Sequence, residues 1–206
     1  MGQITIRELE KLDFFEGISQ DILQNLLNES TVASYKKKEV IFHSRTRTEF
    51  VYFVLSGEVM LYNLTKHGNR KVIFILGKGR LLNQSIVSKK PNALFGEAVC
   101  PVQALKIPEG VFLRFMEQCH ELTYSILREY ERNLWRMGHQ LKNTTGNMQT
   151  ERKIAAKLWK LGRDFGVETE EGVMVDIDLT ITLMADLVGV PRENVSRACK
   201  VLTDRG

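Results

Sequence analysis

The stretch of residues 180–206, TITLMADLVGVPRENVSRACKVLTDRG, constrains the fold of this chain more than any other. Ala185 lies where two helices would have to approach closely, and Gly189 lies where the backbone would have to turn between them. Val195 follows at the position where the second helix would pack under the first. A small residue, a glycine suited to a turn and an apolar residue at this spacing predict a helix-turn-helix.

The second of these helices has two chemically different faces. Val195, Cys199 and Leu202 recur at i, i+4 and i+7, so they are its predicted buried stripe. An arginine can bond O6 and N7 of guanine together, and a carboxylate can accept a hydrogen bond from N4 of cytosine. The opposite face is either the solvated side of an amphipathic helix or, as we predict, a set of base-reading side chains: Arg192, Glu193, Ser196 and Arg197.

Residues 31–107 lack the helical period and contain short runs rich in β-branched and aromatic residues instead. The runs are TVASY, EVIFH, FVYFVL, EVMLYNL, KVIFIL and AVCPVQALKI, with turn signals at Ser56-Gly57 and His67-Gly68-Asn69. Many short strands joined by tight turns predict an antiparallel roll or barrel. Before them, residues 14–29 predict an amphipathic helix that covers one end of the roll, with Ser19 as its N-cap. The apolar face of that helix is expected to be Ile22, Leu23, Leu26 and Leu27.

After a short helical link over 109–117, a long helix is predicted from Cys119 onward. Its residues Tyr130, Leu134, Met137, Leu141, Thr144 and Met148 alternate at spacings of four and three, as in the seam of a coiled coil. A seam needs a partner, so we expect a parallel homodimer, while Leu127 and Trp135 on another side pack on the roll. The alternative is that the stripe itself packs on its own roll.

A further helix over 150–166 should be capped by Thr150 and bury Ile154, Leu158, Trp159 and Leu161. Residues 167–179 are expected to form a short hairpin. The chain is therefore predicted to be an α+β protein in three parts. Residues 1–118 would form an effector-sensing antiparallel β-roll, residues 119–148 a dimerisation helix and hinge, and residues 149–206 a helix-turn-helix DNA-binding domain.

Composition narrows the class of protein. Of the 206 residues, 43% are hydrophobic and 26% charged, as in soluble globular proteins. No run approaches the roughly 18 apolar residues of a membrane helix, and the start lacks the apolar core of a signal peptide. We therefore expect a cytoplasmic protein without a membrane partner. Cys100, Cys119 and Cys199 show no CxxC spacing, so they are expected to be packed or free thiols.

Residues 31–90 contain twelve basic and three acidic side chains. This excess suggests an anionic small-molecule effector. The alternative is that these lysines and arginines lie at exposed strand edges and hairpin tips, where charge prevents sheets from pairing.

The order of roll, long helix and C-terminal helix-turn-helix resembles the CRP/FNR family of bacterial transcription regulators. Residues 53–62, FVLSGEVMLY, look like the family's glycine turn, and Arg192-Glu193-x-x-Ser196-Arg197 is similar to its recognition-helix signature. The resemblance implies a homodimer on palindromic double-stranded DNA with TTGAT-like or TGTGA-like half-sites, acting with RNA polymerase under a small-molecule or redox signal. It also implies DNA-backbone contacts from Thr180, Thr182 and Lys200.

The departures from the family bear on the effector. Members that bind cyclic AMP carry a Gly-Glu pair and an Arg-Ser pair, whereas this chain has Asn83-Gln84 and Asn92-Ala93 there. Without that arginine a phosphate loses its bidentate partner, so cyclic AMP is not expected and the effector is unknown. The resemblance places the pocket at Tyr62, Asn83, Gln84, Ser85 and Asn92.

No cysteine precedes Cys100, which excludes the iron–sulfur cluster of the oxygen-sensing branch. Haem stays open, because any of four histidines could be an axial ligand: His43, His67, His120 and His139. No metal site is predicted. Family members continue past the recognition helix into a β-wing, so an end at Gly206 predicts a truncated or absent wing.

Two other function classes remain at this point, although we do not expect an enzyme. The first is a cupin-like metal enzyme with an accessory helical domain, but the roll offers only His43 and His67, without paired spacing. The second is a sensor or interaction module that does not bind DNA.

Overall fold

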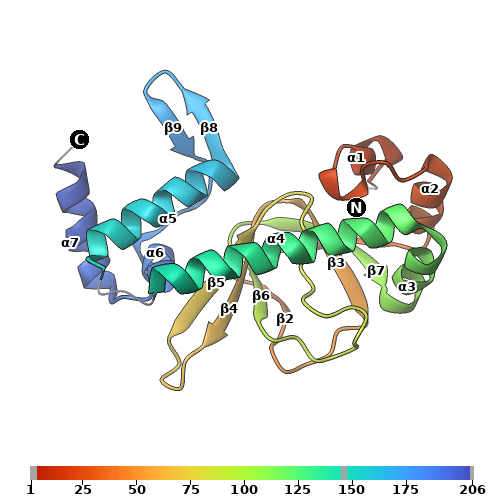
Figure 1. The fold of residues 1–206 in the computed structure, drawn as a ribbon, viewed down its shortest axis with the longest axis horizontal. Coiled ribbons are helices and arrows are strands. Elements are labelled where there is room, and N and C mark those ends of the chain that lie inside the picture. Colours follow the sequence, from red (N-terminus) through yellow and green to blue (C-terminus); the bar gives the residue numbers. More distant parts are fainter. Residues whose placement is uncertain (1–3, 145–147, 205–206) are drawn as a thin grey trace. The chain divides into compact units, whose positions relative to one another are not determined.

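A computed structural model describes residues 4–144 and 148–204 (Figure 1). By its contacts the chain divides into two compact units. The roll unit comprises residues 1–63 and 74–135, and the C-terminal unit comprises residues 64–73 and 136–206. The three-part division expected from the sequence stays a prediction.

Two antiparallel sheets make the roll. One has the strand order β1-β7-β3, and the other has the order β2-β6-β4-β5. Their strands are β1 (Thr31–Tyr35), β2 (Val40–Phe42), β3 (Phe50–Ser56), β4 (Val59–Leu64), β5 (Arg70–Leu76), β6 (Phe95–Ala98) and β7 (Val102–Pro108). The predicted antiparallel roll is thus confirmed.

Five of the six predicted β-rich runs each form one strand. The prediction was wrong for AVCPVQALKI, which contains the end of β6 and most of β7. The two strands lie in different sheets, and Cys100 and Pro101 lie between them. Proline has no N–H to donate to a ladder, so a strand interior is a poor place for it.

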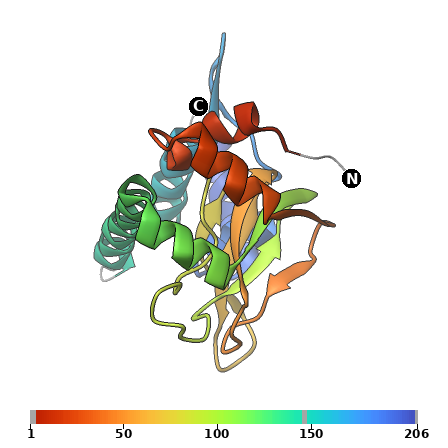
Figure 2. The same cartoon turned by 90° about the vertical axis from the view of Figure 1, so that its right-hand side faces the viewer.

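Short helices cover one end of the roll (Figure 2). They are α1 (Ile6–Glu10), the 3-10 turn η1 (Asp13–Phe15), α2 (Gln20–Asn28) and α3 (Glu109–Gln118). In α2, Leu23 and Leu26 are buried as predicted, whereas Ser19 occupies the N-cap position without a side-chain capping bond. A full capping box at Thr5 and Glu8 starts α1. The predicted covering helix is confirmed.

Aromatic rings form the centre of the roll unit's core. Phe53 of β3 is fully buried, and its ring centroid lies 4.5 Å from that of Phe14, 5.0 Å from that of Phe15 and 5.7 Å from that of Phe112. Each ring comes from a different element except Phe14 and Phe15, which share η1. One strand, one turn and one helix are therefore held together by the same cluster.

The long helix α4 (His120–Thr144) packs its first half on the roll unit (Figure 1). Leu122 and Ile126 are buried in the core. One turn further on, the buried Glu129 carboxylate accepts a bond of 3.5 Å from Arg80. No described helix is both long enough and apolar enough to cross a bilayer.

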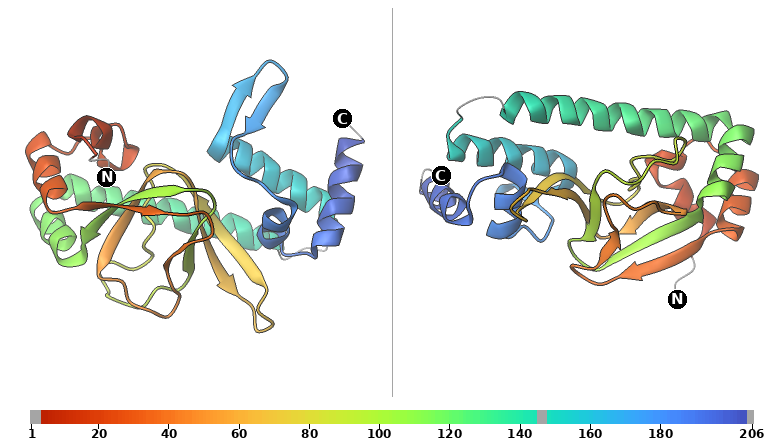
Figure 3. Two further views of the ribbon diagram at one scale, coloured as in Figure 1. Left: turned by 180° about the vertical axis from the view of Figure 1, so that it is seen from behind. Right: turned by 90° about the horizontal axis from the view of Figure 1, so that it is seen from below.

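The C-terminal unit contains α5 (Thr150–Phe165), β8 (Gly166–Thr169), β9 (Gly172–Val175), α6 (Ile181–Val188) and α7 (Arg192–Thr203). Strands β8 and β9 pair as a hairpin that extends away from α5 (Figure 3). Ile154 and Leu161 of α5 are buried, as predicted.

Two predictions for α5 were wrong. Thr150 is the first helical residue, and Gln149 takes the N-cap position. Trp159 is 66% exposed, and the Arg163 guanidinium carbon lies 5.0 Å from its ring centroid. A tryptophan can remain at the surface when a guanidinium covers its face.

Gly57, between β3 and β4, provides a test of the roll's tightest turn. Its φ is +79°, and an added Cβ would overlap the carbonyl oxygen of Pro101. We expect Gly57→Ala to lower the free energy of unfolding by more than about 2 kcal/mol, because left-handed strain and a backbone overlap combine. Gly68 is the matched control, since its φ is +78° but nothing lies within 4 Å of its added Cβ.

Urea unfolding of both variants would measure the difference. Gly68→Ala should cost only about 1–2 kcal/mol, the strain of the left-handed conformation alone. Equal losses in the two variants would contradict the role given to the contact with Pro101.

Candidate nucleic-acid interface

The end of α6 and the turn after it have the geometry of the predicted helix-turn-helix. Thr180 is the N-cap of α6, and its hydroxyl accepts a bond of 3.1 Å from the Leu183 N–H. Gly189 ends the helix with a φ of +72°, and its N–H donates to the Ala185 carbonyl at 2.8 Å. Only glycine takes this left-handed conformation without strain, so the turn is specified locally.

One face of α7 is buried inside the C-terminal unit. Val195 and Ala198 are 0% and 2% exposed, and α7 packs against both α5 and α6. The predicted stripe is confirmed at Val195 and is only half-buried at Cys199 and Leu202. The burial of Ala198 was not predicted, because a small side chain adds little to an apolar pattern although it permits close packing.

The opposite face of α7 is exposed over its whole length. Within it, the Arg197 guanidinium donates a bond of 2.6 Å to the Asn194 side-chain oxygen. That bond holds the guanidinium beside the helix, with its acceptor at i and its donor at i+3. The exposed side chains include all four predicted base readers and one predicted backbone contact: Arg192, Glu193, Ser196, Arg197 and Lys200.

The other two predicted backbone contacts lie at the start of α6. Thr180 and Thr182 are both exposed. The Thr180 hydroxyl already accepts the capping bond, so only its O–H remains to donate to a phosphate. The DNA-contact assignments of α6 and α7 stay predictions.

The predicted dimer seam on α4 is only partly on an exposed face. Leu134 is 71% exposed, Met137 45% and Leu141 64%, but Tyr130 packs against the roll core. The side chain of Thr144 lies outside the described part of the chain. Met148 is half-buried and follows the end of α4.

The expectation that Leu127 and Trp135 pack on the roll was wrong. They are 55% and 61% exposed. Leu122 and Ile126 fill that role, since the helix turns its 122–126–130 side toward the core. Leu127, Leu134 and Leu141 are thus exposed at intervals of seven, the period of one position in a coiled-coil seam.

The side chains predicted to form an effector pocket make hydrogen bonds within the roll. The buried Asn83 accepts from the Tyr52 N–H at 2.8 Å and donates to the Phe50 carbonyl at 2.9 Å. Gln84 accepts from the Leu94 N–H at 3.2 Å, and the buried Asn92 donates to the Thr46 carbonyl at 3.1 Å. These amides hold the segment that precedes β6 against neighbouring backbone.

The two remaining pocket residues differ in burial. Tyr62 is buried, stacks on Phe95 at 5.1 Å between centroids, and donates from its hydroxyl to the buried Glu97 at 2.9 Å. Ser85 shares a hydrogen bond of 2.7 Å with Ser88. The assignment of all five residues to an effector pocket stays a prediction.

Histidines and cysteines do not gather in the described residues. No group of three His, Cys, Asp or Glu side chains there could hold a metal ion. The His43 ring meets Phe95 edge-on at 5.7 Å. Burial raises the pKa of the Cys119 thiol, which disfavours the reactive thiolate.

Comparisons with known proteins match this architecture. Residues 32–119 fit the profile described as a cyclic nucleotide-binding domain. The chain is 22% identical over 199 residues to a CRP-like cAMP-activated global transcriptional regulator of Mycobacterium tuberculosis, covering 96% of this chain and 88% of that protein. It is 24% identical over 169 residues to a global nitrogen regulator of Nostoc, covering 81% and 75%.

Among solved structures, FixK2 from Bradyrhizobium japonicum has a TM-score of 0.75 at 21% identity, covering 86% of each chain. A CRP/FNR-family regulator from Thermus thermophilus has a TM-score of 0.69 at 22% identity, covering 85% of this chain and 87% of that chain. These neighbours share the fold described above. The relatives named here are described as transcription regulators rather than as enzymes.

Proposed function

We propose that this chain is a transcription regulator of the CRP/FNR type and that it binds double-stranded DNA as a homodimer. The observation that carries the proposal is the division of α7 into a buried and an exposed face. Val195 and Ala198 anchor the helix, while two arginines and a carboxylate stay in solvent on the other side. A groove-reading helix needs that arrangement, since its base contacts must be free while its position is held.

The proposed site is a palindrome with TTGAT-like or TGTGA-like half-sites. A two-fold dimer presents two equivalent helices, so the half-sites should be centred about one helical turn of DNA apart. Arg192, Glu193, Ser196 and Arg197 would contact base edges, and Thr180, Thr182 and Lys200 would contact phosphates. RNA polymerase is the proposed partner in regulation, in the cytoplasm.

We further infer that the roll senses a small molecule other than cyclic AMP. The match to a cyclic nucleotide-binding domain supports a small-molecule effector. Two observations argue against cyclic AMP. Positions 92 and 93, where cyclic-AMP binders carry an Arg-Ser pair, are Asn92 and Ala93 in this chain. In addition, the side chains of Asn83, Gln84 and Asn92 already make hydrogen bonds to neighbouring backbone.

Replacing Arg197 with alanine tests the reading of bases. After selection of bound sequences from random DNA, the variant should discriminate less well between the selected palindrome and a scrambled one. The expected loss is about 1–3 kcal/mol, because a bidentate contact to guanine is removed. Titrations of labelled duplexes at one fixed salt concentration would measure it, since affinity for DNA depends steeply on salt.

Lys200→Ala is the matched control, because it also removes one exposed cation from α7. A phosphate contact carries no sequence information, so this variant should bind both duplexes more weakly by a similar factor. Unchanged discrimination in Arg197→Ala would favour the alternative that the chain is an interaction module.

A further inference from the structure

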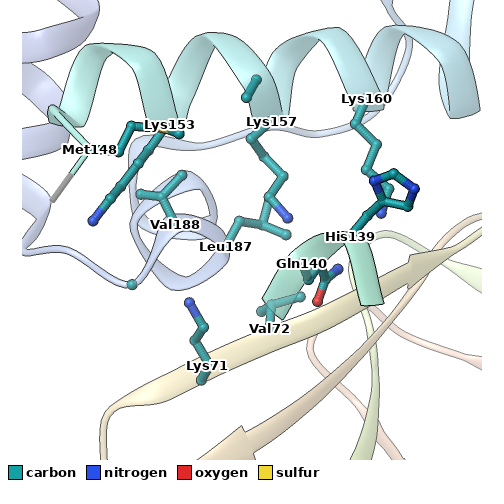
Figure 4. A pocket seen from close by; sticks show the side chains of 12 residues that line it. Lys71, Val72, His139, Gln140, Met148, Lys153, Lys157, Lys160, Leu187 and Val188 are labelled. Carbon is teal, nitrogen blue, oxygen red and sulfur yellow. The ribbon is translucent and has the colours of Figure 1, made fainter. Parts of the chain in front are cut away.

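A second candidate binding site lies entirely within the C-terminal unit, away from the exposed face of α7. It is a cavity of about 310 Å³ between α5, the end of α4, the segment 64–73 and the turn after α6 (Figure 4). This volume is near the lower end of the range for small-molecule sites. Twelve residues line the cavity, and neither an aspartate nor a glutamate is among them.

Four of the lining residues are lysines. Lys153, Lys157 and Lys160 recur at i, i+4 and i+7, so they share one face of α5. Lys71 comes from β5, on the opposite wall, and its ammonium group points into the space (Figure 4). Like charges at these spacings repel one another, so this arrangement is unfavourable by itself.

Few acidic side chains offset the positive charges of these lysines. Among the described residues, Lys71, Lys153 and Lys157 form no ion pair. The charge of Asp164 raises the pKa of Lys157, but the Asp164 carboxylate also accepts a bond of 2.8 Å from Arg136. The described residues therefore supply no ion pair for the charges of Lys71, Lys153 and Lys157, although Asp164 raises the pKa of Lys157.

The pKa values of two lysines reflect this environment. The pKa of Lys157 is lowered to about 8; burial is the largest cause, the nearby charges of Lys160, Lys71 and Arg136 act in the same direction, and Asp164 opposes them. Burial and the charge of Lys153 lower the pKa of Lys71. An anion among these side chains would favour their charged forms.

The glycine in the turn after α6 leaves room for one of the lysines. A Cβ at Gly189 would lie 2.6 Å from the Lys71 ammonium nitrogen, so glycine leaves the space that this ammonium group occupies. Two further lining residues, Val72 of β5 and Leu187 of α6, are buried apolar side chains. The cavity thus combines several point charges with an apolar surface.

We propose that this cavity binds a small oligophosphate, a molecule with at least two adjoining phosphate groups, either free or carried by a nucleotide. Lysine ammonium groups bind phosphate oxygens as point charges from several directions, whereas a single carboxylate would neutralise only part of the cluster. The ligand would join segment 64–73 to α5 and to the turn after α6. This site goes beyond the proposed function and does not depend on DNA binding by α7.

Calorimetric titration of the full chain without DNA tests the proposal, with inorganic pyrophosphate, orthophosphate, ADP and adenosine at one ionic strength. Pyrophosphate and ADP should bind measurably more tightly than orthophosphate, and adenosine should not bind. If ADP binds more tightly than pyrophosphate, the apolar walls hold a nucleoside and the source is a nucleotide. If pyrophosphate binds as tightly as ADP, the oligophosphate alone is the ligand.

The double variant Lys153→Gln with Lys157→Gln should weaken pyrophosphate binding at least about tenfold, because two charge-assisted contacts are lost. Lys66→Gln, on the same unit but outside the cavity and exposed, controls for the loss of positive charge. The double variant should melt no lower than the parent, since it removes repulsion. A weakening of similar size in Lys66→Gln, or no binding of pyrophosphate and ADP by the parent, would overturn the proposal.

Proton linkage provides a second readout. Lys157 is partly deprotonated near pH 8, so anion binding should take up protons there, and affinity should fall as pH rises above 8. The groups that face it are Lys153, Lys160 and Asp164 of α5, Lys71 of β5, and Arg136 and His139 of α4. Titrations in buffers of different ionisation enthalpy should show this uptake in the parent and a smaller one in Lys157→Gln. Equal uptake in both proteins would contradict the assignment.

Discussion

Replacing Leu127 and Leu134 together with glutamate is expected to convert the proposed dimer into a monomer. In the isolated chain these side chains are 55% and 71% exposed, and they lie seven residues apart on α4. In a parallel dimer each would be buried against its copy, so the double variant would place four carboxylates in an apolar seam. We expect the dissociation constant of the dimer to rise at least about a hundredfold, the equivalent of about 3 kcal/mol.

Sedimentation velocity at micromolar concentrations would measure the change, and circular dichroism would check that α4 is still helical. Methionine at both positions is the control, because it keeps the face apolar and should leave the dimer intact. The glutamate variant should also lose binding to the palindrome, since one α7 can occupy only one half-site. A glutamate variant that remained dimeric would place the interface elsewhere, and a monomeric parent would refute the dimer itself.

The second large effect is expected from Phe53→Ala, which should lower the free energy of unfolding by about 3–5 kcal/mol. Phe53 is 0% exposed, and its ring contacts aromatic side chains of η1 and α3 within 4.5–5.7 Å between centroids. An alanine would leave a cavity that three separate elements would have to fill. The loss is a large part of the stability of an ordinary domain.

Urea unfolding followed by fluorescence and circular dichroism would measure this loss. Phe50, on the same strand, is half-buried and lies under the Lys106 ammonium group at 3.7 Å, so Phe50→Ala should cost much less. If Phe53→Ala proves too unstable to purify, Phe53→Leu should still show a smaller loss of the same sign. Equal losses at positions 50 and 53 would contradict the central role of the aromatic cluster.

Local patterns predicted most of the elements correctly. The glycines at 57 and 189 identified turns because their left-handed φ values of +79° and +72° are strained for any side chain. Short runs rich in β-branched and aromatic residues identified five strands, and the spacing around Val195 identified the helix-turn-helix. Each of these patterns involves residues that are close together in the sequence, so it can be interpreted without knowing the rest of the fold.

The sequence does not show which groups a side chain contacts in the folded protein. Trp159 has an apolar ring at a helical spacing, yet its ring is covered by Arg163 rather than buried. Asn83 and Gln84 were assigned to an effector pocket by the resemblance to the family, and the structure adds that their amides make hydrogen bonds to backbone near them in space. The predicted assignment of these amides to an effector stays a prediction.

The sequence by itself determined the order of roll, long helix and helix-turn-helix, and which face of α7 is polar, because periodicity and turn chemistry are properties of short segments. Only the tertiary structure decided which side of α4 the roll uses, so that Leu122 and Ile126 are buried while Leu127 is exposed. It also brought Lys71 together with Lys153 and Lys157, which lie more than seventy residues away in the chain. Such groupings depend on how distant segments pack, and no local pattern contains that information.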